Sequence, residues 1–125
     1  MSNLEYIQYL VVNALEEVKG QNILVLDTSE KSSFFDCVII ASGVSNRQTR
    51  ALAKSVVESL KENEGIVCSV EGEDNGEWVL VDCGDIICHV MQPEIREYYN
   101  LEGIWGTNSV SLEYIKNCRT KLTKC

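Results

Sequence analysis

The sequence predicts one α/β domain in which helices flank a mixed sheet of about five strands. Two observations predict this fold class. In two long segments, apolar residues recur at three- and four-residue intervals, as they do on the buried face of a helix. Between and after these segments lie short apolar stretches of strand length, bounded by glycine and acidic residues. Helices that alternate with strands, with one hairpin late in the chain, favour a mixed sheet covered by helices.

The first third of the chain predicts one helix and two strands. The helix is expected over residues 3–19, where the apolar stripe ends at Gly20, a plausible C-cap. A short apolar run over 23–26 predicts the first strand. Residues 37–41 predict the second strand, and because they are apolar on both faces we expect this strand in the interior of the sheet.

The second helix has a clear start. Ser45 and Gln48 have the spacing of a capping box, in which the two side chains satisfy free amides of the first turn. The helix is expected to run to about residue 63. Gly65 then precedes a third strand, predicted over 66–70.

A hairpin and a third helix complete the predicted body. Strands are expected over 77–82 and 85–90, joined by a two-residue turn at Cys83–Gly84. A proline at the first helical position predicts a helix over 93–100. The chain is thereby divided into a body domain, residues 1–106, and a basic C-terminal tail, residues 107–125.

The charge of the chain is uneven. Residues 1–106 hold 7 Lys and Arg against 18 Asp and Glu, a net charge of −11, whereas residues 107–125 carry +3. Nucleic-acid binders need basic surfaces, so little direct nucleic-acid contact is expected of the body. An acidic body suits a basic protein partner, although acidic charge also serves solubility. The tail is expected to add a short helix around 110–118, to touch RNA, or to be a disordered end.

Six cysteines and one histidine give little support for a metal or a cofactor. None of the cysteines forms a C-x-x-C pair, and we expect no cofactor and no metal. Four cysteines lie in or beside apolar runs and are expected to be buried: Cys37, Cys68, Cys83 and Cys88. No apolar run approaches the roughly 18 to 20 residues of a membrane span, and the start of the chain lacks a secretory signal. We therefore expect a cytoplasmic protein with no membrane contact.

An enzymatic alternative depends on two aspartates. Asp82 and Asp85 are candidate metal-binding carboxylates, and Gly43 with Ser45 is a candidate phosphate-contacting turn, together suggesting a nucleotidyltransferase. The turn lacks the glycine and lysine content of a phosphate-binding loop, and both aspartates bracket a hairpin. His89 is expected to be structural, with Asp82 or Asp85 as its hydrogen-bond partner.

Aromatic residues favour a docking surface over an active site. Strict alternation predicts that Trp78 and Leu80 share one face of their strand. Four large side chains then follow within eight residues: Tyr98, Tyr99, Leu101 and Trp105. Trp and Tyr are typical interface anchors, since they bury much area with few rotatable bonds. The alternative is that both tryptophans belong to the core.

A set of motifs carries a resemblance to a known family. They are Gly43-x-Ser45-x-Arg47, Glu71-Gly72, Glu77-Trp78-Val-Leu-Val-Asp82, Gly84-Asp85, His89-Val90 and Arg96-x-x-Tyr99-x-Leu101-Glu102-x-x-Trp105. In this order and spacing they resemble the ribosomal silencing factor family, also called Iojap-like. The resemblance covers residues 3–106. It implies a sheet similar to that of nucleotidyltransferases, without their activity.

The resemblance also implies a function. Members of the family bind the large ribosomal subunit at ribosomal protein uL-fourteen and keep the small subunit from joining, so translation falls when nutrients are scarce. Some homologues act in mitochondria and chloroplasts, but without a transit peptide a bacterial cytoplasmic protein is expected here. A homodimer that uses the exposed aromatic residues is a further possibility for the free protein.

The expected partner-binding residues come from two sources. The resemblance implies a docking patch and a second conserved segment, which together comprise Trp78, Val79, Leu80, Tyr99, Leu101 and Glu102. The charge pattern adds acidic residues for pairing with a basic ribosomal protein, namely Glu71, Glu77, Asp82 and Asp85.

Overall fold

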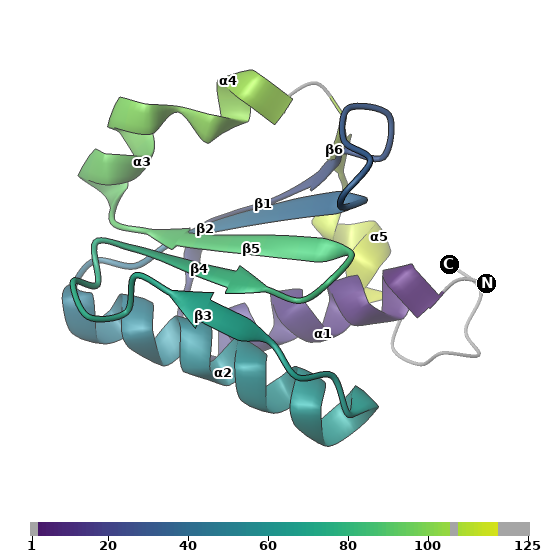
Figure 1. The fold of residues 1–125 in the computed structure, drawn as a ribbon, viewed down its shortest axis with the longest axis horizontal. Coiled ribbons are helices and arrows are strands. Elements are labelled where there is room, and N and C mark those ends of the chain that lie inside the picture. The colour runs from purple at the N-terminus through teal and green to yellow at the C-terminus, as the bar shows by residue number, and fades with distance from the viewer. Residues whose placement is uncertain (1–2, 106–107, 118–125) are drawn as a thin grey trace.

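In the computed structural model of the protein, the described residues, 3–105 and 108–117, form one mixed sheet between two layers of helices (Figure 1). The strand order is β3-β4-β5-β2-β1-β6. Neighbouring strands are antiparallel except for the central pair β2 and β5, which is parallel. The strands are β1 (Gln21–Asp27), β2 (Cys37–Ser42), β3 (Ser69–Glu71), β4 (Trp78–Asp82), β5 (Ile86–Met91) and β6 (Ser109–Val110).

The helices divide unequally between the two faces of the sheet. Helices α1, α2 and α5 lie on one face, and α3 and α4 lie on the other (Figure 1). The bounds are α1 (Asn3–Glu17), α2 (Asn46–Glu64), α3 (Pro93–Tyr99), α4 (Leu101–Trp105) and α5 (Leu112–Lys116). The expected α/β class and the flanking helices are therefore confirmed.

The central position of β2 follows from its composition. Every residue of β2 is buried, and the strand lies between β5 and β1, which confirms the expected interior strand. Its alternate side chains enter two different cores. Cys37, Ile39 and Ala41 belong to the large core under α1 and α2, whereas Val38 and Ile40 belong to a smaller core that includes parts of α3 and α4. A strand that is apolar on both faces requires cover on both.

The expectation of about five strands is one short. The additional strand is β6, which pairs antiparallel with β1 through Val110 opposite Val25. The short helix expected around 110–118 is present as α5, and its Ile115 is fully buried in the large core. The expected domain boundary at residue 106 falls outside the described residues, as do Cys118 and Cys125.

The ends of α1 and α2 refine the expected caps. At α2 the Gln48 amide donates to Ser45 Oγ (3.1 Å), and Gln48 Oε1 accepts from the Val44 amide (2.8 Å), so the capping box is confirmed with its return bond one residue earlier. At α1 the left-handed residue is Lys19 (φ 65°) rather than Gly20. The third strand is shorter and later than expected, at β3.

The turn between β4 and β5 is centred one residue later than expected. The Cys83 amide donates to the Ile86 carbonyl (2.9 Å), so the two central residues are Gly84 and Asp85 rather than Cys83 and Gly84. Gly84 has φ 91°, a conformation that glycine adopts without steric cost.

Candidate docking face

The side chains of strand β4 alternate between a half-buried face and a fully buried face of the sheet. Trp78 and Leu80 are half-buried on the face that α3 partly covers, whereas Val79 and Val81 are fully buried in the large core. The alternation expected for Trp78 and Leu80 is confirmed. Val79 was expected in the docking patch, but its side chain lies inside the protein and is not part of this surface.

An aromatic patch, defined here as Trp78, Tyr98 and Tyr99, joins β4 to α3. The rings of Trp78 and Tyr99 are 4.9 Å apart between centroids and tilted by 48°. Tyr98 packs edge-on against Tyr99 at 5.0 Å. Tyr98 is 80% exposed and Tyr99 50% exposed, a large aromatic surface to leave in water. Tyr98 was absent from the expected site residues, although its place beside Tyr99 in the sequence could have indicated it.

His89 is held by the patch rather than by an aspartate. The indole Nε1 of Trp78 donates to His89 Nδ1 at 3.0 Å, so the expected partner, Asp82 or Asp85, was wrong. Burial lowers the pKa of His89 to about 4, so the imidazole is neutral at physiological pH. A neutral imidazole can accept this bond and thereby orient the indole. The expectation that His89 is structural agrees with these contacts.

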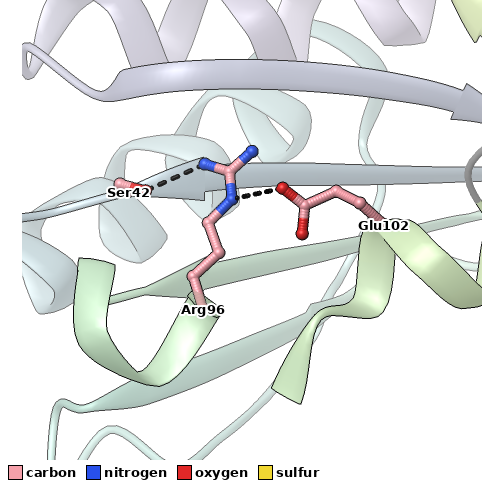
Figure 2. Close-up of polar contacts among 3 residues, drawn as sticks. All are labelled: Ser42, Arg96 and Glu102. Atoms are coloured by element: carbon pink, nitrogen blue, oxygen red, sulfur yellow. Dashed lines mark hydrogen bonds and ion pairs between the residues drawn. The ribbon is translucent and has the colours of Figure 1, made fainter. Parts of the chain in front are cut away.

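The bend between α3 and α4, called the elbow here, positions the second expected binding segment, Tyr99 to Glu102. Figure 2 shows the polar contacts that hold it. Arg96 Nε contacts Glu102 Oε2 at 3.0 Å, and Arg96 Nη1 donates to Ser42 Oγ at 2.8 Å. The chain bends at Asn100, whose φ is 49°. Leu101 is half-buried against the smaller core. In this structure Leu101 and Glu102 therefore secure the elbow, and Tyr99 is the expected residue of this segment that is exposed. Nothing in the sequence near Arg96 pointed to Ser42, which is 54 residues away.

Acidic residues border the aromatic patch. Glu71 and Glu77 are both exposed at the two ends of the loop that joins β3 to β4. The Arg50 side chain fixes this loop by donating to the carbonyls of Glu73 (2.6 Å) and Asp74 (2.8 Å). The loop also depends on a glycine where it approaches β4.

That glycine is Gly72. It has φ 86°, and a Cβ atom there would lie 2.2 Å from the carbonyl oxygen of Trp78. A larger residue would displace the strand that carries the aromatic patch.

The aspartates of the enzymatic alternative lie far from the candidate phosphate turn. The Asp82 carboxylate accepts from the Gly84 amide (2.9 Å), as expected of a turn element. The Asp85 carbonyl bonds the amide of Asp36, just before β2, whereas Gly43 follows the other end of β2. Six residues of strand separate the two sites by roughly 20 Å. The aspartates and the turn therefore do not form one site.

The described residues offer neither a metal-binding cluster nor a membrane-spanning helix. Residues 3–105 and 108–117 contain no cluster of three or more His, Cys, Asp or Glu side chains able to hold a metal. Within the same ranges, none of the helices is both long enough and apolar enough to cross a membrane. Trp105 was expected to be either an interface anchor or a core residue, and its side chain lies outside the part of the chain that the structure describes.

The family model and the relatives that match this chain carry the same family name. The family model described as ribosomal silencing factor during starvation matches residues 3–124. The chain is 48% identical over 103 residues to the ribosomal silencing factor RsfS of Chromobacterium violaceum, covering 82% of this chain and 84% of that protein. It is 36% identical to RsfS of Bacillus subtilis, covering 83% and 88%.

A solved structure agrees with the fold. The crystal structure of a Chromobacterium violaceum protein matches with a TM-score of 0.81 and 48% sequence identity, covering 89% of this chain and 92% of that chain. The family match extends past residue 106, where the sequence resemblance had ended.

Proposed function

The chain belongs to the ribosomal silencing factor family, whose members regulate translation and are not enzymes, and on this premise we propose that it docks on the large ribosomal subunit. The proposed contact is ribosomal protein uL-fourteen, and the proposed consequence is that the small subunit cannot join. Translation would then fall under nutrient limitation. The relatives compared above are bacterial, and we propose a cytoplasmic location.

The observation that carries this proposal is the exposed aromatic patch. Trp78, Tyr98 and Tyr99 form one continuous ring cluster, and Trp78 packs against the smaller core, which includes residues of α3 and α4. Aromatic side chains dominate interface energies because they desolvate a large area at a small entropic cost. Leu80 extends the apolar surface along β4.

The charge around the patch supports a basic protein partner. Glu71 and Glu77 are exposed beside Trp78, and Asp82 and Asp85 are exposed at the other end of β4. Carboxylates steer a basic partner toward the surface and repel phosphate groups. We therefore propose that the protein makes little direct contact with ribosomal RNA.

A nucleotidyltransferase activity is not part of the proposal. The family is not enzymatic. A relationship of the sheet to nucleotidyltransferases without their activity stays a prediction, which a structural superposition on such enzymes would test.

Co-sedimentation with separated ribosomal subunits tests the proposed function. The protein should pellet with large subunits and not with small ones, and it should reduce the 70S fraction when both subunits are mixed. Equal binding to both subunits, or to neither, would refute it.

A crosslinking arm of the same experiment identifies the contact. A photo-crosslinker placed at Tyr98, which is 80% exposed, should capture uL-fourteen. Capture of a different large-subunit protein would contradict the proposed contact while keeping subunit binding. A free homodimer through the aromatic patch would compete with docking, and sedimentation velocity at nanomolar concentration would detect it.

A further inference from the structure

Two free cysteines face one another at the edge of the sheet. In the antiparallel pairing of β3 with β4, Ser69 lies opposite Asp82. One step outward along both strands brings Cys68 opposite Cys83. Both side chains contact the large core.

The backbone geometry of this pair suits a covalent link. The Cys83 amide donates to Ile86 on the β5 side, so the backbone polar groups of Cys83 point away from β3. Opposed residues whose polar groups point away from each other form the narrow type of antiparallel pair, with Cα atoms about 4.5 Å apart. Disulfides span Cα separations of roughly 4.4 to 6.8 Å. Cys68 and Cys83 are therefore placed to bond without a large backbone movement.

Exposure distinguishes this pair from the other described cysteines. Cys37 and Cys88 are fully buried on the central strands. Cys68 is half-buried, and Cys83, which lies opposite it, is 8% exposed. Within the described part of the chain, Cys68 is thus the thiol that a small oxidant in water can reach.

We propose that Cys68 and Cys83 form a modification site in which hydroperoxides generate a disulfide that fastens the edge strand β3 to β4. With hydrogen peroxide, the thiolate sulfur of Cys68 attacks one peroxide oxygen, which breaks the O–O bond and leaves a sulfenic acid and hydroxide. The hydroxide takes up the proton that the Cys68 thiol had released and becomes the first water. The Cys83 sulfur then attacks the sulfenic sulfur of Cys68. The S–S bond forms, the hydroxyl group leaves with the Cys83 proton as water, and two thiols and one hydrogen peroxide have become one disulfide and two waters.

The environment of the two thiols assigns these roles. Cys68 is the more exposed of the two thiols, and its interaction with the Cys83 thiol lowers the pKa of Cys68, which favours the attacking thiolate. Interaction with Cys68 and burial raise the pKa of Cys83, so this thiol is the protonated partner of the pair. Cys68 is the nucleophile and Cys83 is the resolving thiol.

The disulfide has a defined structural effect. It closes a ring that contains β3, β4 and the loop that joins them, and so restrains an edge strand of only three residues. Trp78 lies at the far end of β4 from Cys83. Oxidation is therefore expected to stabilise the sheet edge without covering the aromatic patch, and the inference is independent of ribosome binding.

Mass spectrometry of the native protein after peroxide treatment tests the pair. Remaining thiols are alkylated under denaturing conditions, and the chain is cleaved after glutamate without reduction. Cleavage separates Cys68, in residues 65–71, from Cys83 and Cys88, in residues 78–94. The expected product is a linked pair of these peptides whose fragment ions place the bond at Cys83. Unlinked Cys68, or Cys68 joined to Cys88, Cys118 or Cys125, would overturn the proposal.

Variants provide the matched comparison. Cys83→Ser should abolish the linked product, and Cys88→Ser should retain it. Oxidised wild type should melt roughly 10 °C higher than reduced protein, since the closed ring restricts the unfolded chain. An equal shift in Cys83→Ser would contradict the inference. If that variant does not fold, the peptide map of the wild type still decides.

Discussion

The indole of Trp78 and the imidazole of His89 are joined by one hydrogen bond, from Nε1 to Nδ1 at 3.0 Å, between neighbouring strands. The bond requires that Nδ1 carry no proton. It therefore links the protonation state of the half-buried His89 to the orientation of the Trp78 ring in the aromatic patch. A centroid distance of 4.9 Å from Trp78 to Tyr99 extends this link to α3.

The first prediction concerns pH. The pKa of His89 falls from 6.5 in the unfolded chain to about 4 in the folded protein, because burial disfavours the charged ring. Between these values the unfolded state binds the extra proton. Stability that is present above pH 6.5 is therefore lost as the pH falls toward 4, by about 2 kcal/mol at pH 5. Urea denaturation at pH 7 and pH 5 measures this loss.

The control for that prediction is His89→Gln, which keeps an acceptor for the indole but does not titrate. His89 is the one histidine of the chain, so the variant removes all histidine titration. It should lose clearly less stability than wild type between pH 7 and pH 5. If both proteins lose the same amount, the titrating group is not His89.

The second prediction separates two neighbours in sequence that lie on opposite faces. Trp78→Ala should weaken binding to large subunits by about 2 kcal/mol or more, roughly thirtyfold in Kd, because a central aromatic anchor is removed. Val79→Ala should instead lower the free energy of unfolding by about 2 kcal/mol through a core cavity. Val79 is fully buried, so its folded fraction should bind normally.

Two measurements check this pair. Circular dichroism establishes that each variant is folded, and co-sedimentation gives its affinity for the large subunit. A folded Trp78→Ala protein with wild-type affinity would remove the aromatic patch from the docking site. A binding loss in folded Val79→Ala would mean that the buried face also matters for docking.

The third prediction concerns charge. Glu71→Gln with Glu77→Gln should slow association with large subunits about threefold at low salt, since steering of a basic partner is weakened. The difference should shrink at high salt because of screening. Glu58→Gln with Glu62→Gln, which removes equal charge from the exposed side of α2, is the matched control. Stopped-flow association at two salt concentrations distinguishes the pairs, and equal slowing would indicate a non-specific charge effect.

The sequence could predict what local periodicity encodes. The interior position of β2 follows from its unbroken apolar run, and the shared face of Trp78 and Leu80 follows from alternation along one strand. Strand β6 was missed because Ser109–Val110 is too short to show a period. It exists because the edge of β1 offers unpaired backbone groups, a condition set by tertiary structure.

The pairing between strands, which decides the hydrogen-bond partner of His89, could not be predicted from the sequence either. His89 and Asp85 are close along the hairpin, which made an aspartate the natural expected partner. The register instead places Leu80 opposite His89 and so brings the side chain of Trp78 within reach. A register is decided by the whole sheet, and no single segment contains it.

The fourth prediction concerns the elbow that holds α3 and α4 to the sheet (Figure 2). The Arg96 side chain is 11% exposed and pairs with Glu102, which is 32% exposed. Removing either partner leaves a poorly hydrated charge, so Arg96→Ala and Glu102→Ala should each cost about 2 kcal/mol of stability. The double variant should cost clearly less than the sum of the two, with a coupling of about 1 kcal/mol or more.

A double-mutant cycle by urea denaturation measures that coupling, and the chain supplies its own reference. Lys54 and Glu58 form an exposed pair at 4.0 Å on α2, for which the coupling should stay below about 0.5 kcal/mol. Hydrogen exchange should also show faster exchange in α3 and α4 for Arg96→Ala, because these short helices lose their anchor to Ser42. Additive losses at Arg96 and Glu102, with unchanged exchange in α3 and α4, would show that packing of Leu101 alone holds the elbow.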